Sequence, residues 1–166
     1  MKPVRRLFVF SLALALVLAA GASARVAGSD TGSLEVQRGN GTVVVQMMRG
    51  ALIGRFAAGR ISVTSRRGGA EVTVFGAEET IQLNDSTTVY RGRDVRFKVS
   101  GQGWRVGIQA LGLDASLVGR GVATLRGVGM MSVGGAALQP WPTDFRSVPL
   151  GATTPTAEGS GTIRGG

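Results

Sequence analysis

The chain has 166 residues with 19 basic and 10 acidic side chains, a formal net charge of +9, and neither cysteine nor histidine. This length fits about one domain. The missing residue types exclude disulfides, Ser-His-Asp and Cys-His nucleophile systems, and zinc sites of the Cys/His type. Glycine supplies 27 residues, which is about twice its average usage and fits a chain with many tight turns.

The N-terminus has the pattern of a secretory signal peptide. Three basic residues precede an apolar run over 7–20, and the small-x-small sequence Ala22-Ser23-Ala24 follows. The run is shorter than the roughly 20 residues needed to span a bilayer. We predict a signal peptide over 1–24 that is cleaved after Ala24, with an uncleaved anchor as the alternative. Removal of its three positive charges leaves a net charge of +6 and no stable membrane span. The predicted location is secreted or cell envelope.

The first part of the mature chain reads as a lead-in followed by strands. The segment 25–32 is small and polar and is expected to be flexible. Period-two alternation predicts strands over 33–38 and 60–65. Gly39-Asn40-Gly41 indicates a turn. The stretch 42–48 is apolar on both faces, so it is predicted to be a central strand covered on both sides.

Alternation continues through the middle of the chain. Strands are predicted over 70–76 and 79–83, with Val72, Val74, Ile81 and Leu83 turned inward. Arg66-Arg67-Gly68-Gly69 indicates a turn before them, and Asn84-Asp85-Ser86 indicates a turn after them.

The clearest pattern spans Asp94–Ala110. Apolar residues alternate with polar ones on both sides of the Gly-rich break 100–103, which is typical of a β-hairpin with one buried face. The inward residues are expected to be Val95, Phe97, Val99, Trp104, Val106, Ile108 and Ala110.

The last strands are predicted over 113–117, 122–126 and 128–133. Two prolines keep Gln139-Pro140-Trp141-Pro142 from being an interior strand, and we expect Trp141 to lie over an open end of the core. The tail 147–166 is rich in Pro, Gly, Thr and Ala and is predicted to be disordered.

Turn signals recur at a spacing of about 8–12 residues, which favours one all-β domain over 33–146. The expected architecture is a single antiparallel β-sandwich or barrel-like sheet with glycine-rich turns. The alternative is a β-solenoid, in which recurrent pairs such as Gly54-Arg55 and Gly119-Arg120 mark the corners of stacked coils.

No catalytic residue, metal site or cofactor is predicted. The glycine-rich phosphate loops, the nucleophile elbow and the calcium-loop pattern do not occur in the mature sequence. A glycoside hydrolase needs two carboxylates across a cleft. Glu78-Glu79 is the only adjacent pair of acids, and neighbours on a strand point to opposite faces. We expect a protein that is not an enzyme, and a carboxylate-dependent hydrolase is the second alternative.

One charge pattern suggests a binding site. In a hairpin with the loop 100–103, Lys98 would lie opposite Arg105, with Arg96 beside it, and like charges directly opposite are destabilising. Splayed side chains or a nearby acid would relieve this, or the patch would bind an anionic cell-wall polymer, acidic glycan or lipid head group. Arg96, Lys98 and Arg105 are therefore candidate polyanion-binding residues. Nucleic acid is not an expected partner of an exported protein with 5% aromatic residues.

The segment Val89–Val99, the motif Gly103-Trp-Arg-Val and the segment 118–127 resemble small secreted β-rich proteins of high-GC Gram-positive bacteria, whose activity is unknown. The resemblance covers roughly 33–145 and rests on strands punctuated by Gly and Arg. It implies an exported β domain and no functional residues. The leading expectation is a non-catalytic envelope or extracellular protein with a structural or adhesive role, and a glycan- or polyanion-binding module is the first alternative.

Overall fold

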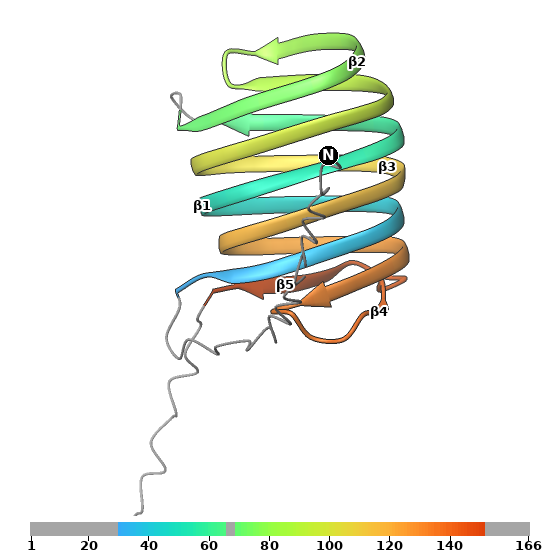
Figure 1. The fold of residues 1–166 in the computed structure, drawn as a ribbon. Coiled ribbons are helices and arrows are strands. Elements are labelled where there is room, and N and C mark those ends of the chain that lie inside the picture. Colours follow the sequence, from blue (N-terminus) through green and yellow to red (C-terminus); the bar gives the residue numbers. More distant parts are fainter. Residues whose placement is uncertain (1–29, 66–68, 152–166) are drawn as a thin grey trace, which may run out of the picture.

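The computed structural model describes residues 30–65 and 69–151, and these residues are all-β (Figure 1). The signal peptide with its cleavage site at Ala24, most of the lead-in and residues 152–166 lie outside the described residues. The strands are β1 (Gly32–Ser65), β2 (Ala70–Asn84), β3 (Thr87–Val133), β4 (Gln139–Pro140) and β5 (Arg146–Leu150). Every strand pair is antiparallel, which confirms the predicted all-β class and its pairing direction. In the described part of the chain, no helix is long and apolar enough to cross a membrane.

The two longest strands, β1 and β3, wind together in successive turns (Figure 1). One β3 residue pairs with two β1 residues that lie eighteen positions apart, as Val106 does with Val45 and Val63. A turn of β3 therefore lies between two turns of β1. β2 pairs with β3 at one end of the sheet, and β4 and β5 pair with β3 near the other end.

Glycines divide each turn into two sides. At the bends, glycines of neighbouring turns pair with each other. Gly41, Gly50 and Gly59 of β1 follow one another at intervals of nine residues, or half a turn, and all have positive φ. We call these bends the glycine corners; their pairs are Gly50 with Gly101 and Gly119, Gly59 with Gly92, and Gly41 with Gly127. The first side is formed by 42–49, 60–65, 102–109 and 120–126, and the second side by 51–58, 93–100 and 111–118.

The glycine corners are close backbone contacts. A Cβ at Gly50, whose φ is 154°, would lie 2.5 Å from the carbonyl oxygen of Val118 and 3.0 Å from the Cα of Gly119. The corner also shifts the alternation of inward and outward side chains by one position. Met47 and Leu52, five residues apart, are both buried, whereas Met48 and Arg49 between them are both exposed. Side chains can therefore point inward on both sides of the bend.

The core lies between the two sides. A small cavity is lined by Val43, Val45 and Ile108 of the first side and by Leu52 and Leu117 of the second, so the two sides share one interior. These five side chains are at most 3% exposed. Fully burying one aliphatic side chain of this size contributes about 1.5–3 kcal/mol, so the shared interior is the main source of stability.

The hairpin predicted for 94–110 is wrong in its pairing, although its inward residues are correct. All seven are buried, but both halves belong to β3, which bends at Gly101 and does not pair with itself. Lys98 pairs with Ile53 and Thr73, and Arg105 pairs with Gln46 and Thr64. The predicted turn at 39–41 is likewise a bend within β1. Alternation identifies the buried face, but it does not identify the partner strand.

Two further expectations are corrected. The strand over 42–48 has a neighbour along each edge, but its outer face is open, with Met48 65% exposed. Leu83 is 61% exposed because β2 is the last strand of the sheet. Val72, Val74 and Ile81 on the same strand are only partly buried.

The C-terminal part of the described chain closes one end of the core. The predicted disordered tail was expected from residue 147, but Arg146–Leu150 forms β5, which buries Val148 and Leu150. The expectation for Trp141 is confirmed: it is 4% exposed, and its ring lies against Gly39. Its indole Nε1 donates a hydrogen bond to the carbonyl oxygen of Met130 at 3.1 Å.

We predict that Gly50→Ala lowers the free energy of unfolding by on the order of 2–3 kcal/mol, because the new methyl group overlaps backbone atoms of β3. Gly134→Ala is the matched control. Its φ is also positive, at 62°, but a Cβ there meets nothing within 4 Å. The control should lose only about 1 kcal/mol. Urea unfolding followed by circular dichroism measures both, and equal losses would contradict the close-contact explanation.

Candidate functional site: an arginine-rimmed pocket

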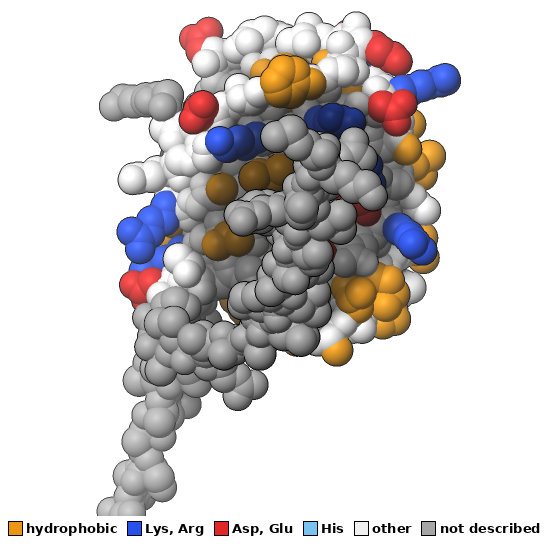
Figure 2. Space-filling view, viewed as in Figure 1, with side chains coloured by type: hydrophobic (Ala, Val, Ile, Leu, Met, Phe, Trp, Pro, Cys, Tyr) orange, Lys and Arg blue, Asp and Glu red, His pale blue; other side chains and the backbone are white. Residues whose placement is uncertain are grey.

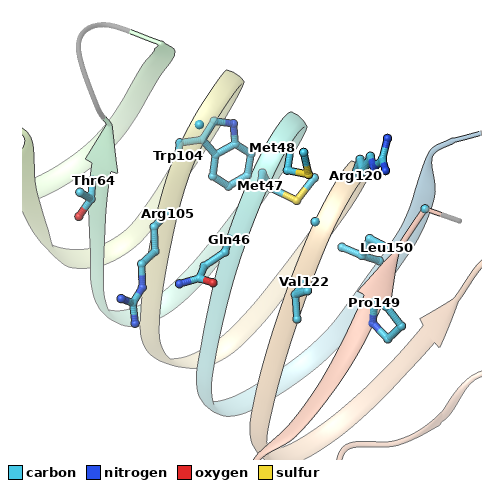
Figure 3. A pocket seen from close by; sticks show the side chains of 13 residues that line it. Gln46, Met47, Met48, Thr64, Trp104, Arg105, Arg120, Val122, Pro149 and Leu150 are labelled. Atoms are coloured by element: carbon cyan, nitrogen blue, oxygen red, sulfur yellow. The ribbon is translucent and has the colours of Figure 1, made fainter. Parts of the chain in front are cut away.

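A large hollow opens on the first side, where β1 and β3 lie close to β5 (Figure 3). Its volume is about 760 Å³, within the range of ligand pockets in proteins. We call it the arginine-rimmed pocket. Its lining residues are Gln46, Met47, Met48, Thr64, Gly103, Trp104, Arg105, Arg120, Gly121, Val122, Pro149, Leu150 and Gly151.

Three of the apolar residues at the pocket belong to the hydrophobic core. Met47, Trp104 and Leu150 are each at most 4% exposed, and they come from β1, β3 and β5. Two glycines help to keep the space open. Gly103 has φ 61° and no atom within 4 Å of a Cβ, and a Cβ at Gly121 would lie 2.7 Å from the sulfur of Met47.

The indole N–H of Trp104 is buried and has no hydrogen-bond partner among the residues that the structure describes. The other tryptophan, Trp141, donates to a backbone carbonyl. An unpartnered buried donor costs about 1–3 kcal/mol. Trp104 therefore carries a buried donor that the described protein atoms leave unsatisfied.

The rim carries positive charge. Arg105 and Arg120 line the pocket, none of its described lining residues is acidic, and Arg49 lies directly opposite Arg120 on the neighbouring strand. All three arginines are exposed. Arg105 points outward from the sheet, whereas its neighbour Trp104 points into the core, because neighbours on a strand face opposite sides.

Opposed arginines occur at three places in the β1–β3 ladder. Arg55 faces Arg96, and there Asp114 forms an ion pair with Arg55 at 3.0 Å. Arg60 faces Arg91, which pairs with Glu79 at 3.3 Å.

The third pair is Arg49–Arg120, and neither residue forms an ion pair with any residue that the structure describes. Like charges directly opposite each other are destabilising. One member of this uncompensated pair, Arg120, lines the pocket.

The three residues predicted to bind a polyanion do not lie together. Arg105 is on the first side at the pocket, whereas Arg96 and Lys98 are on the second side. The local argument placed Lys98 opposite Arg105 and missed Arg49 and Arg120. The regular spacing of the glycines is the signal that could have revealed Arg49 and Arg120. Arg49 precedes Gly50 and Arg120 follows Gly119, and these two glycines pair at a corner.

A smaller hollow of about 300 Å³ on the second side contains two carboxylates, Asp94 and Asp114, together with Arg55 and Arg96. Asp114 accepts hydrogen bonds from the backbone N–H of Arg38 at 2.9 Å and from Arg55 Nε and Nη2 at 3.1 and 3.0 Å. The Arg38 N–H is the largest cause that lowers the pKa of Asp114, and Arg55 lowers it further. Arg38 has φ 51°. The Asp114 carboxylate thus stays ionised and holds two turns of β1 together.

The architecture and the pocket define an all-β protein with an apolar, arginine-rimmed site on its outer surface. No family model, curated protein or solved structure matches the chain. The resemblance to secreted proteins of high-GC Gram-positive bacteria stays a prediction. Among residues 30–65 and 69–151 there is no group of three or more acids placed to hold a metal ion.

We predict that Asp114→Asn destabilises the protein by on the order of 1 kcal/mol at pH 7, a modest value because the side chain is 37% exposed. The folded pKa lies below the ordinary value of 3.8, so the contribution of Asp114 is complete above that value and is lost as the pH falls through the folded pKa. Urea unfolding at pH 7 and near pH 3 should show the gap between wild type and variant shrinking in acid. A gap that grows in acid would contradict the assigned role.

Proposed function

We propose that the protein is an exported, non-catalytic envelope or extracellular protein that binds an anionic component through the arginine-rimmed pocket. The observation that carries this proposal is the opposed pair Arg49–Arg120, which forms no ion pair with any described acid and of which Arg120 lines the pocket, as Arg105 does. A bound anion would attract both arginine side chains and thereby offset the repulsion between them. Binding of this kind also gives an adhesive role a molecular basis.

The backbone supports the proposal because it fixes the spacing of the charges. Arg49 and Arg120 lie on paired strands, and Arg105 lies on the turn of β3 that pairs with the same segment of β1. Ladder hydrogen bonds and glycine corners hold these positions before any ligand arrives. A guanidinium group offers a planar fork of donors that suits phosphate and carboxylate groups. Three such groups at fixed backbone positions on neighbouring strands can serve as a receptor for an anion.

For the packing of the fold, we propose that the two sides face each other as the two sheets of a sandwich do. The cavity lined from both sides supports this, because its volume is only about 10 Å³, which indicates a filled interior. The two sides are joined at the corners because β1 and β3 each run through both of them. This combines the expected sandwich-like packing with the corners expected of the β-solenoid alternative.

A carboxylate-dependent hydrolase is the second candidate, because Asp94 and Asp114 line one hollow. A general acid at neutral pH needs a raised pKa, and the pKa of Asp114 is lowered by its contacts with Arg38 and Arg55. These contacts favour a structural role for this carboxylate. The binding function is therefore the better supported of the two.

We predict that Arg49→Gln with Arg120→Gln weakens binding of inorganic polyphosphate at least 10-fold. Isothermal titration calorimetry on the mature chain at 50 mM and 200 mM salt measures the effect, and the salt dependence should also fall. The matched control is Arg96→Gln with Lys98→Gln, which removes the same charge from the second side. It should change the affinity less than 2-fold. Equal losses in both double variants, or no loss in the first, would overturn the proposed function.

A further inference from the structure

We infer that the anionic component is a linear, phosphate-linked polymer without aromatic bases, which lies across the outer face of the first side and contacts one arginine on each of four neighbouring strands. In strand order these residues are Arg120, Arg49, Arg105 and Arg60. The inference rests on the proposed function and names the ligand class. It extends the site from the arginine-rimmed pocket along the whole face.

The first argument is the difference in charge between the two sides. The four segments of the first side contain no acid and five arginines, namely Arg49, Arg60, Arg105, Arg120 and Arg126. None of the five forms an ion pair with an acid that the structure describes. The three segments of the second side contain four basic residues and two aspartates. Figure 2, which views the molecule from the second side, shows acidic side chains among the basic ones. A polyanion is therefore complementary to the first side.

The second argument is that the arginines of the first side face outward. The buried Trp104 and Val106 flank Arg105, and the buried Ile61 follows Arg60. Because neighbours on a strand point to opposite faces, both arginines lie outside the sheet. Figure 3 shows the Arg105 side chain directed away from the Trp104 ring. One ligand on the outer face can therefore contact both arginines.

The third argument is the distance over which the charges are spread. Arg49 lies opposite Gln102 of β3, and Arg60 lies opposite Gln109 of the same segment. These two β3 positions are seven residues apart, which is about 20 Å along an extended strand. Arg105 lies between them in the sequence. A small anion cannot reach all three arginines at once, whereas an extended chain can.

The surface along this path is hollowed. A hollow of about 450 Å³ on the same face is lined by Arg60, Ser62, Gly107 and Gln109, among others, and none of its described lining residues is acidic. Gly107 has no side chain and lies midway between Arg105 and Gln109. The Ser62 hydroxyl donates a hydrogen bond to the carbonyl oxygen of Gly107 at 3.2 Å, so this polar side chain stays close to the sheet. A polymer chain can therefore lie between the arginines without meeting a bulky side chain.

The chemistry of the face favours phosphate. Guanidinium forks match phosphate oxygens. Arg49 and Arg120 lie on neighbouring strands, about 5 Å apart at the backbone, so the charges of the ligand must also follow one another closely. Phosphates linked in a chain do so, whereas a polyuronic acid carries one carboxylate on each sugar ring. The segments of the first side contain one aromatic residue, the buried Trp104, so the face has no platform on which nucleobases could stack.

The first test compares four probes by isothermal titration calorimetry on the mature chain in 50 mM salt. The probes are long-chain polyphosphate, tripolyphosphate, polygalacturonate and oligothymidylate, compared at equal concentrations of anionic groups. We expect long-chain polyphosphate to bind at least 10-fold more tightly than each of the others, because it alone combines closely spaced charges with sufficient length. Equal affinity for tripolyphosphate, for polygalacturonate or for oligothymidylate would overturn the inference.

The second test uses Arg60→Gln, which removes an exposed charge outside the arginine-rimmed pocket. This variant should weaken binding of long-chain polyphosphate at least 3-fold and change the affinity for tripolyphosphate less than 2-fold. The matched control is Arg93→Gln, which removes the same charge from an exposed position on the second side. It should change both affinities less than 2-fold. An equal loss in the two variants would show an effect of net charge alone, and the inference would fall.

The outcomes distinguish this inference from the proposed function. If binding depends on Arg49 and Arg120 but Arg60→Gln has no effect and tripolyphosphate binds as tightly as the long chain, the polymer inference falls and the anion-binding function stands. If Arg49→Gln with Arg120→Gln changes no affinity, both proposals fall.

Discussion

The close backbone contact between glycines of neighbouring turns is the constraint on which the rest of the structure depends. At Gly50 and Gly119 the two strands approach too closely for a side chain on either residue. This contact lets β1 and β3 bend while the ladder between them continues. It also shifts the alternation by one position, so that residues on both sides of the bend point to the same interior. Without such corners, strands of 34 and 47 residues could not share one core.

The same corners determine where charge accumulates on the outer surface. The bend at Gly50 places two successive residues, Met48 and Arg49, toward solvent, and Arg49 lies opposite the exposed Arg120 of the neighbouring strand. In this account the pocket lies at the bend, because it is lined by Gly103 and Gly121, which are each two residues from the corner glycines Gly101 and Gly119. The fold and the proposed binding function therefore share one physical origin.

The sequence predicts which residues are buried better than it predicts how the strands pair. Val95, Val99, Trp104 and Val106 can be assigned inward from alternation alone, because the two-residue period of a strand is local. Pairing depends on contacts between residues far apart in the chain. The break at 100–103 has the composition of a hairpin loop and also that of a corner, and no local pattern separates the two.

The candidate site shows the same difference between what local sequence predicts and what depends on strand pairing. Arg105 can be proposed from its local context, whereas Arg49 and Arg120 meet only through the register of β1 against β3. The nine-residue spacing of Gly41, Gly50 and Gly59 is the one local feature that would have suggested this register. The short strand β5 was missed because Pro149 and its brief apolar alternation resemble the tail that follows.

The winding of β3 between turns of β1 is tested most directly by engineered disulfides, since the chain has no cysteine of its own. Residues directly opposite on antiparallel strands lie within disulfide range. Under mild oxidation, Lys98→Cys should cross-link with Ile53→Cys in one double variant and with Thr73→Cys in another, because Lys98 lies between these two residues. Lys98→Cys with Arg105→Cys should remain reduced. A cross-link in that last variant, with none in the first two, would restore the local hairpin and contradict the account.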